Sequence, residues 1–173
     1  KRAAHGRLAL APAIEKAMRQ MREAPAPVPA SPGEPLAEEK QLLSRAKRVA
    51  LVTAGLAHRR FGEELQNEQE VTASLSDMVA AVYGMESALL RTEKLVAAGR
   101  GEQALDMTRL VIRDSMGQIG DSAKAVLAAC CSDKDLDQYL SFLQQLPPST
   151  AINSIRKRRD VAGRLLSAEK FLL

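Results

Sequence analysis

The sequence predicts an all-α protein: an up-and-down helical bundle of about four to five helices, preceded by a connector helix and a proline-rich linker. Apolar residues make up 46% of the chain but aromatic residues only 3%, a composition that favours helices over sheets. Three long segments repeat their apolar residues at spacings of three and four, as helices that pack on helices do. With 173 residues, the chain is long enough to bury a core as one domain.

The first 35 residues divide into a helix and a linker. We assign residues 1–23 to the connector helix region, in which the helix itself runs from about Pro12 to Glu23, because Pro12 suits the first helical position. One face of this helix repeats the apolar residues Ile14, Met18 and Met21. Residues 24–35 hold most of the prolines, which predicts an extended linker. Residues 36–173 then form the helical bundle.

Three long helices should pack through apolar seams. The first seam consists of Leu42, Ala46, Val49, Thr53 and Leu56. The second consists of Val71, Leu75, Met78, Val82, Met85 and Leu89. The third consists of Ile112, Met116, Ile119, Ala123, Val126 and Cys130. Gly99 and Gly101 predict the turn between the second helix and the third.

Two shorter helices complete the predicted bundle. The first ends before Pro147 and Pro148, and its inward residues are Leu136, Leu140 and Leu143. The second is the last helix, and Ser149 or Thr150 is a candidate cap for its first turn. Its shared apolar face consists of Ile152, Ile155, Ala162 and Leu166.

No pattern in the chain points to catalysis, to cofactor binding or to a metal site. His5 and His58 lack the His or Cys three or four residues away that a metal site would supply, and no Glu-x-x-His occurs. Gly99 and Gly101 follow a helix rather than a strand, which excludes a phosphate-binding loop. The clustered acids Glu63, Glu64, Glu68 and Glu70 fit the start of a helix. We predict no catalytic, cofactor-binding or metal-binding residue here.

The adjacent cysteines Cys130 and Cys131 are interpreted as reduced thiols, because regular backbone points neighbouring side chains apart. No apolar run approaches the roughly 20 residues that span a bilayer, and the first residues do not resemble a secretory signal. We therefore expect a protein that is not secreted.

Charge is distributed unevenly along the chain. Residues 1–60 carry 12 basic and 5 acidic side chains, residues 61–149 carry 7 and 14, and residues 150–173 carry 6 and 2. Such sections either neutralise one another after folding or attract a charged partner. Asp106 and Asp114 lie on a helix that must bury one face, so each could pair with Arg91 or Arg109 and set the register of the bundle.

The last helix carries the one patch with a functional pattern. Its basic residues are Arg156, Lys157, Arg158, Arg159 and Arg164. A basic amphipathic helix suits an anionic membrane or a protein partner. An ordinary bundle helix with a solvated basic face has the same pattern. Nucleic acid is disfavoured, because no aromatic residues are interleaved for base stacking.

The most distinctive segment of the chain is RFGEELQNEQEVTASLSDMVAAVYGMESALLRTEKLVAAG, residues 60–99. It resembles the C-terminal extension of the very-long-chain type of acyl-CoA dehydrogenase. ALDMTRLVIRDSM (104–116) and TAINSIRKRRDVAGRLL (150–166) are also similar to that extension. RAAHGRLALAPAIEKAM (2–18) is similar to the connector that follows the catalytic core in this family.

The resemblance implies a C-terminal helical domain of an FAD-dependent enzyme of fatty acid β-oxidation that converts acyl-CoA to trans-2-enoyl-CoA. The family's flavin-binding elements and its base glutamate lie before the connector, so no catalytic residue is carried over, and neither Glu86 nor Glu93 is assigned as a base. It further implies FAD in the full-length enzyme only, packing on the catalytic core of the same polypeptide, a homodimer, and a cytoplasmic or inner-mitochondrial-membrane location. The alternative is a free-standing, non-enzymatic helical adaptor that binds a protein or anionic lipid.

Overall fold

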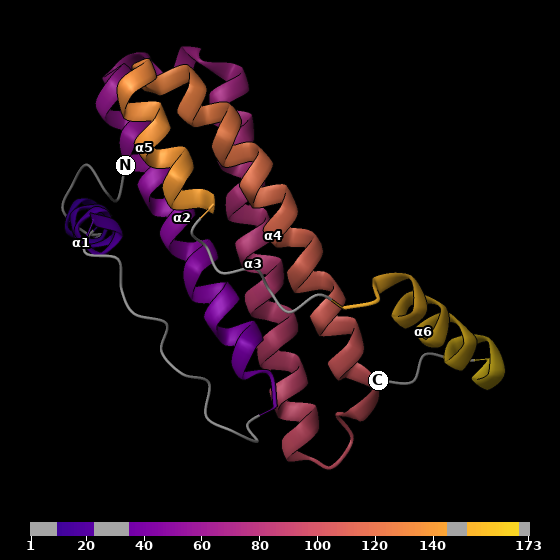
Figure 1. The fold of residues 1–173 in the computed structure, drawn as a ribbon. Helices are drawn as coiled ribbons and strands as arrows, with labels where there is room; N and C mark the ends of the chain where they lie inside the picture. The colour runs from indigo at the N-terminus through magenta and orange to yellow at the C-terminus, as the bar shows by residue number, and fades with distance from the viewer. Residues whose placement is uncertain (1–9, 23–34, 145–151, 170–173) are drawn as a thin grey trace.

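The computed structural model describes residues 10–22, 35–144 and 152–169, which form helices and no strand (Figure 1). The all-α prediction is confirmed. The predicted linker at 24–35 lies outside the described residues except for Pro35. The elements are α1 (Leu10–Arg22), α2 (Ala37–Phe61), the 3₁₀ helix η1 (Gly62–Asn67), α3 (Gln69–Ala97), α4 (Glu102–Cys130), α5 (Asp133–Gln144) and α6 (Ser154–Ala168).

Three long helices, α2, α3 and α4, lie side by side with alternating direction and enclose the main core (Figure 1). The predicted seams supply this core. The most deeply buried side chains are Met78, Met85, Ile112, Ile119, Val49, Val126 and Thr53. Because each seam repeats at three and four residues, it stays on one side of its helix for the whole length of the bundle.

The turn from α3 to α4 depends on glycine, as the sequence indicates. Gly99 has φ of 71°, a left-handed conformation that only glycine adopts without cost. Gly101 is buried in the turn, and a Cβ atom there would lie 2.6 Å from both the Cα and the N of Val96. The turn is therefore tight enough to hold α3 and α4 in close contact.

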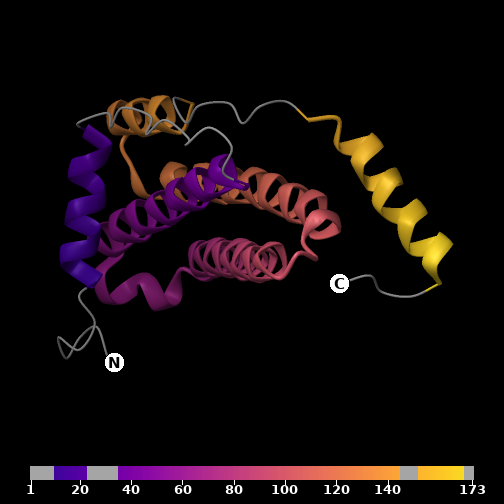
Figure 2. The same cartoon turned by 90° about the horizontal axis from the view of Figure 1, so that it is seen from below.

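A second, smaller core joins α1 and α5 to the bundle. Ala17 and Met18 of α1 are buried with Val52, Leu56 and Leu127. Leu136, Tyr139 and Leu143 of α5 are half-buried against this cluster. Figure 2 shows α1 crossing one end of the bundle, on the side opposite α6. The connector helix thus packs directly on α2.

Two buried hydroxyl groups join α3 to α4. Oγ1 of Thr92 and Oγ1 of Thr108 lie 2.7 Å apart, and the two residues are 2% and 3% exposed. Each hydroxyl is therefore shielded from water and depends on the other for a hydrogen bond across the helix interface.

Replacing one of these threonines by Val should cost more than replacing both. Thr92→Val leaves the hydroxyl of Thr108 without its cross-helix partner, and we expect a loss of about 1–3 kcal/mol in the free energy of unfolding. Thr92→Val/Thr108→Val removes both polar groups and should recover most of that loss. Urea denaturation of the two single variants and the double variant measures the coupling. Strictly additive losses would contradict this pairing.

The last helix departs from the prediction. α6 buries no residue, and its apolar side chains Ile155 and Leu166 are 64% and 77% exposed, so the predicted inward face does not pack in the bundle. The cap also differs: the helix begins at Ser154, and the side chain of Asn153 accepts a hydrogen bond from the backbone N–H of Arg156 at 2.9 Å. Ser149 and Thr150 lie outside the described residues. α6 consequently stands beside α4 as an arm (Figure 2).

Candidate functional site

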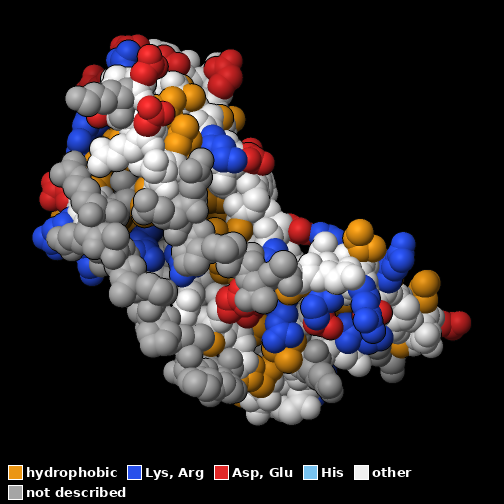
Figure 3. Space-filling view, in the orientation of Figure 1, with side chains coloured by type: hydrophobic (Ala, Val, Ile, Leu, Met, Phe, Trp, Pro, Cys, Tyr) orange, Lys and Arg blue, Asp and Glu red, His pale blue; other side chains and the backbone are white. Residues whose placement is uncertain are grey.

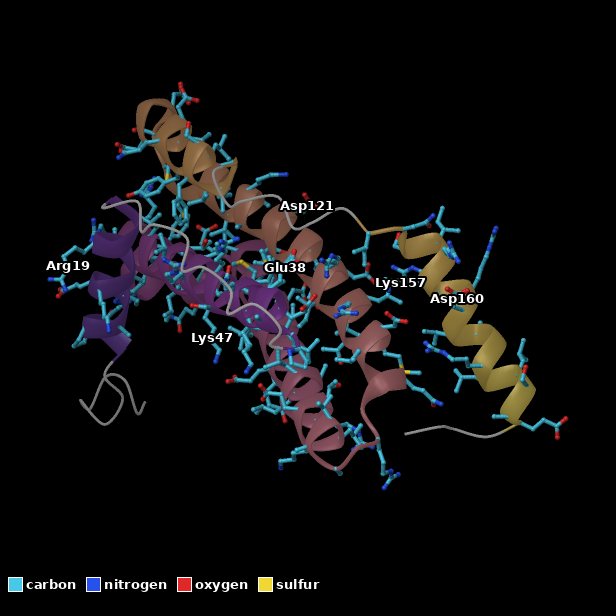
Figure 4. All side chains as sticks on the ribbon, turned by 60° about the horizontal axis from the view of Figure 1, so that its bottom comes forward. Arg19, Glu38, Lys47, Asp121, Lys157 and Asp160 are labelled. Atoms are coloured by element: carbon cyan, nitrogen blue, oxygen red, sulfur yellow. The ribbon has the colours of Figure 1, made fainter. Side chains whose placement is uncertain are left out.

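Lys157 and Arg164, two of the five predicted patch residues, turn toward α4. Nζ of Lys157 lies 2.5 Å from Oδ1 of Asp106, and Nη2 of Arg164 lies 3.6 Å from Oδ2 of the same carboxylate. Figure 4 shows Lys157 between the two helices. Asp106 also pairs with Arg109 one turn along α4, at 3.7 Å. One acid of α4 therefore holds two basic residues of α6.

A third patch residue, Arg158, makes a second contact with α4. Its Nη2 donates to both carboxylate oxygens of Asp114, at 2.7 and 2.8 Å. Asp106 does pair with Arg109, but both residues lie on α4, so this pair does not set the register between helices. Asp114 pairs with α6 rather than with Arg91 or Arg109. Since α6 buries nothing, these ion pairs are the principal polar attachment of the arm.

Arg156 and Arg159 remain on the exposed side of α6. Arg156 lies 3.9 Å from Asp160 on its own helix, and both side chains are more than half exposed. Arg159 is exposed too and shares this side with Ile155 and Leu166. In Figure 3, basic side chains gather on α6 with apolar ones among them. The structure therefore divides the predicted patch into an inward half that is already paired and an outward amphipathic half.

The carboxylate of Asp106 is stabilised in its charged form. Hydrogen bonding to Lys157 holds the pKa of Asp106 below its ordinary value, against the opposing effect of partial burial, and Arg164 and Arg109 lower it further. A lowered pKa in the folded state contributes stability above the ordinary carboxyl pKa of about 4, and that contribution is lost as the pH falls through the lowered value. The attachment of α6 should consequently not change with pH near neutrality.

Neutralising Asp106 should loosen α6. In Asp106→Asn at low salt, we expect the amides of α6 to exchange with deuterium severalfold faster, because the arm has no buried residues to hold it. High salt should do the same to the wild type by screening exposed pairs. Asp121→Asn, whose partner Lys124 lies on the same helix at 3.2 Å, is the matched control. Equal exchange of α6 in the two variants would contradict an electrostatic attachment.

The described residues form a small cavity and an open groove, which are the candidate spaces for a ligand. One lies between α2, α4 and α5, has a volume of about 10 Å³ and is lined by residues that include Val52, Leu127 and Phe142. This is about the space of one water molecule. The other is an open groove of about 680 Å³ between α4 and α6, and its lining includes the acids Asp106 and Asp160 and the basic residues Arg159 and Arg164. A flavin ring does not fit the first, and the second is an open surface groove that does not enclose a ligand.

Other candidate groups are accounted for by local structure. Cys130 and Cys131 are free thiols, and burial, with the neighbouring Cys131, raises the pKa of Cys130 to about 11. Such a thiol is a poor nucleophile at neutral pH. Glu86 and Glu93 pair with Lys47 and Lys40 of α2 at 2.6 and 2.7 Å.

No cluster of three or more His, Cys, Asp or Glu suited to a metal occurs within the described ranges. His58 is exposed in the last turn of α2, and His5 lies outside these ranges. None of the described helices combines the length and the apolar character that crossing a bilayer requires.

The roles of Asp106 and Asp114 as anchors were missed from the sequence. Asp106 and Asp114 are eight residues apart and so lie on one face of α4, while the basic residues follow one another on α6. An acidic face on one helix and a basic run on another were the available signal. This signal does not identify the acidic helix on which the basic helix packs, because the sequence contains several acidic segments.

Comparison with known proteins points to one family. Residues 45–145 match the family described as "Acyl-CoA dehydrogenase, C-terminal domain". The chain is 37% identical over 164 residues to a "Probable acyl-CoA dehydrogenase" of Bacillus subtilis, an alignment that covers 92% of this chain and 28% of that protein.

A solved structure agrees over almost the whole chain. It is titled "Crystal Structure of Acyl-CoA Dehydrogenase complexed with FAD from Bacillus anthracis", and the match has a TM-score of 0.93 with 32% identity. It covers 99% of this chain and 30% of the other. The chain thus spans less than a third of the length of these two relatives.

Proposed function

Because the chain belongs to the acyl-CoA dehydrogenase C-terminal domain family, we propose that it is the C-terminal helical domain of an FAD-dependent dehydrogenase. The proposed substrates are long-chain or very-long-chain acyl-CoA thioesters, which the whole enzyme converts to trans-2-enoyl-CoA in fatty acid β-oxidation. The similarity of fold along 99% of the chain to an acyl-CoA dehydrogenase complexed with FAD carries this proposal.

Within that enzyme, the role of this region is structural. The space between α2, α4 and α5 is too small for a flavin, and the groove between α4 and α6 is open to the surface. Under this proposal the flavin and the catalytic base belong to the preceding part of the polypeptide. The buried seams give the domain a core of its own. Its proposed partners are the catalytic core of the same polypeptide and a second copy in a homodimer, at a cytoplasmic or inner-mitochondrial-membrane location.

The test begins with the native gene product. Its intact mass should be several times the 18.7 kDa of this chain, and it should contain FAD and reduce an artificial electron acceptor with a long-chain acyl-CoA. The 173-residue chain alone should bind no flavin and show no activity. A native mass near 18.7 kDa would refute the proposal and favour the adaptor hypothesis.

The outward half of α6 is also proposed as a peripheral contact with an anionic membrane. Two exposed apolar side chains, Ile155 and Leu166, stand beside Arg156 and Arg159, a combination that suits the interface of a bilayer. Lys157, Arg158 and Arg164 contribute less to this contact, because Asp106 and Asp114 already neutralise them.

Removing the two outward arginines should weaken vesicle binding. A basic residue near an anionic surface contributes about 1 kcal/mol, so Arg156→Ala/Arg159→Ala should reduce binding to vesicles of phosphatidylglycerol and phosphatidylcholine by about tenfold or more. Arg91→Ala/Lys94→Ala removes the same charge from exposed positions of α3 and serves as the control. Co-sedimentation measures both variants. Equal loss in the two would refute a specific role of α6.

A further inference from the structure

An apolar stripe on α3 remains uncovered. Val79, Tyr83 and Leu90 are 63%, 73% and 51% exposed, and their spacings of four and seven place them on one face of the helix. Thr72 and Ser76 continue the same face toward the start of α3. These five residues, the α3 stripe, extend over about 27 Å of helix. Aligned exposed apolar residues of this kind mark a surface that another molecule covers.

The hydroxyls of Thr72 and Ser76 need no outside partner. Oγ1 of Thr72 donates to the backbone carbonyls of Glu68 and Gln69 at 3.1 and 3.0 Å. Oγ of Ser76 donates to the carbonyl of Thr72 at 2.8 Å. Since both hydroxyls bond within the helix, covering them costs little in lost hydrogen bonds to water.

Two acids beside the stripe are paired within the domain. Glu86 bonds Lys47 of α2 at 2.6 Å, and Glu93 bonds Lys40 of α2 at 2.7 Å. Arg91 and Lys94 add exposed basic side chains at the Leu90 end of the stripe. The apolar centre around Val79 and Tyr83, with polar and charged residues at its edge, has the composition of a protein interface.

We propose that the catalytic part of the same polypeptide packs against the α3 stripe. In the proposed enzyme, this catalytic part precedes residue 1. This inference rests on the proposed function. The chain covers only 28% and 30% of its two relatives, and its matched family is a C-terminal domain, so most of such a protein lies upstream. In Figure 2, α1 begins on the side of the bundle where α3 lies.

A photo-cross-linker at position 83 identifies the molecule that covers the stripe. Tyr83→p-benzoylphenylalanine is made in the full-length native protein, irradiated and analysed by peptide mass spectrometry. We expect cross-links to peptides upstream of residue 1. The same cross-linker in place of Asp121, an exposed position on α4, controls for random collisions. Cross-links to residues 1–173 of a second copy, to lipid, or equally from both positions would overturn the proposal.

A charge on the stripe gives an independent measurement. Tyr83→Asp should lower the melting temperature of the full-length protein by several degrees, because it buries an unpaired carboxylate at the contact. Ile155→Asp, at a similarly exposed position of α6, should leave that temperature within about one degree. Equal melting temperatures for the two variants would overturn the proposal. A native mass near 18.7 kDa would instead refute the proposed function itself, which separates the two failures.

Discussion

Replacing Arg113 by Met should lower the free energy of unfolding by about 3–5 kcal/mol, because it leaves a buried carboxylate without its main partner. Glu39 is 3% exposed at the start of α2. Nη1 of Arg113, on α4, lies 3.0 Å from Oε1 of Glu39, and Nη2 lies 3.2 Å from Oε1 of Glu38. Arg109 approaches Glu39 only to 3.8 Å. Urea denaturation of the 173-residue chain measures the loss.

Two further variants test the cause of this loss. Arg158→Met breaks the pair with Asp114, whose side chains are both more than half exposed, and should cost less than about 1 kcal/mol. Glu39→Met/Arg113→Met removes both buried charges and should regain most of the stability lost in the single variant. If the double variant were less stable than Arg113→Met, the unpaired charge would not be the cause.

Truncating Met85 to Ala should destabilise the chain by about 2–5 kcal/mol, because the cavity it leaves lies where three helices meet. Met85 is fully buried, and its cluster includes Val49 of α2 and Ile112 of α4. The loss should appear as a lower urea midpoint with little change in the slope of the transition.

Val79→Ala is the matched control for the cavity. Val79 lies on the same helix and is 63% exposed, so its truncation should change the stability of the 173-residue chain by no more than about 0.5 kcal/mol. Similar losses at the two positions would mean that Met85 does not pack as the structure shows. In the full-length native protein, Val79→Ala should become destabilising, because there the α3 stripe is proposed to be covered.

The sequence predicted most of the bundle because its signals are local. A three-and-four spacing places Met78 and Met85 on one face whatever their partners are, and both proved fully buried. A glycine turn needs only its own backbone, and Gly99 has the expected positive φ. The internal neutralisation of charge was also foreseen in outline, and pairs such as Lys47 with Glu86 carry it out.

The ion-pair partners of the charged residues could not be predicted in the same way. Glu39 and Arg113 are 74 residues apart, and nothing local to either residue singles out the other. The division of the basic patch has the same origin. The five residues Arg156, Lys157, Arg158, Arg159 and Arg164 form one run of charge in the sequence. Only the place of α4 decides which of them meet an acid.

By itself, the sequence determined the helices, their inward faces in the three long segments and the absence of a catalytic pattern, because these follow from the order and type of neighbouring residues. The tertiary structure alone decided that the apolar side of α6 remains exposed. An amphipathic helix can pack through its apolar face or through its charged face. The total free energy of its contacts decides which face packs against the rest of the protein. Here the charged face packs against Asp106 and Asp114, which leaves Ile155 and Leu166 to the outside.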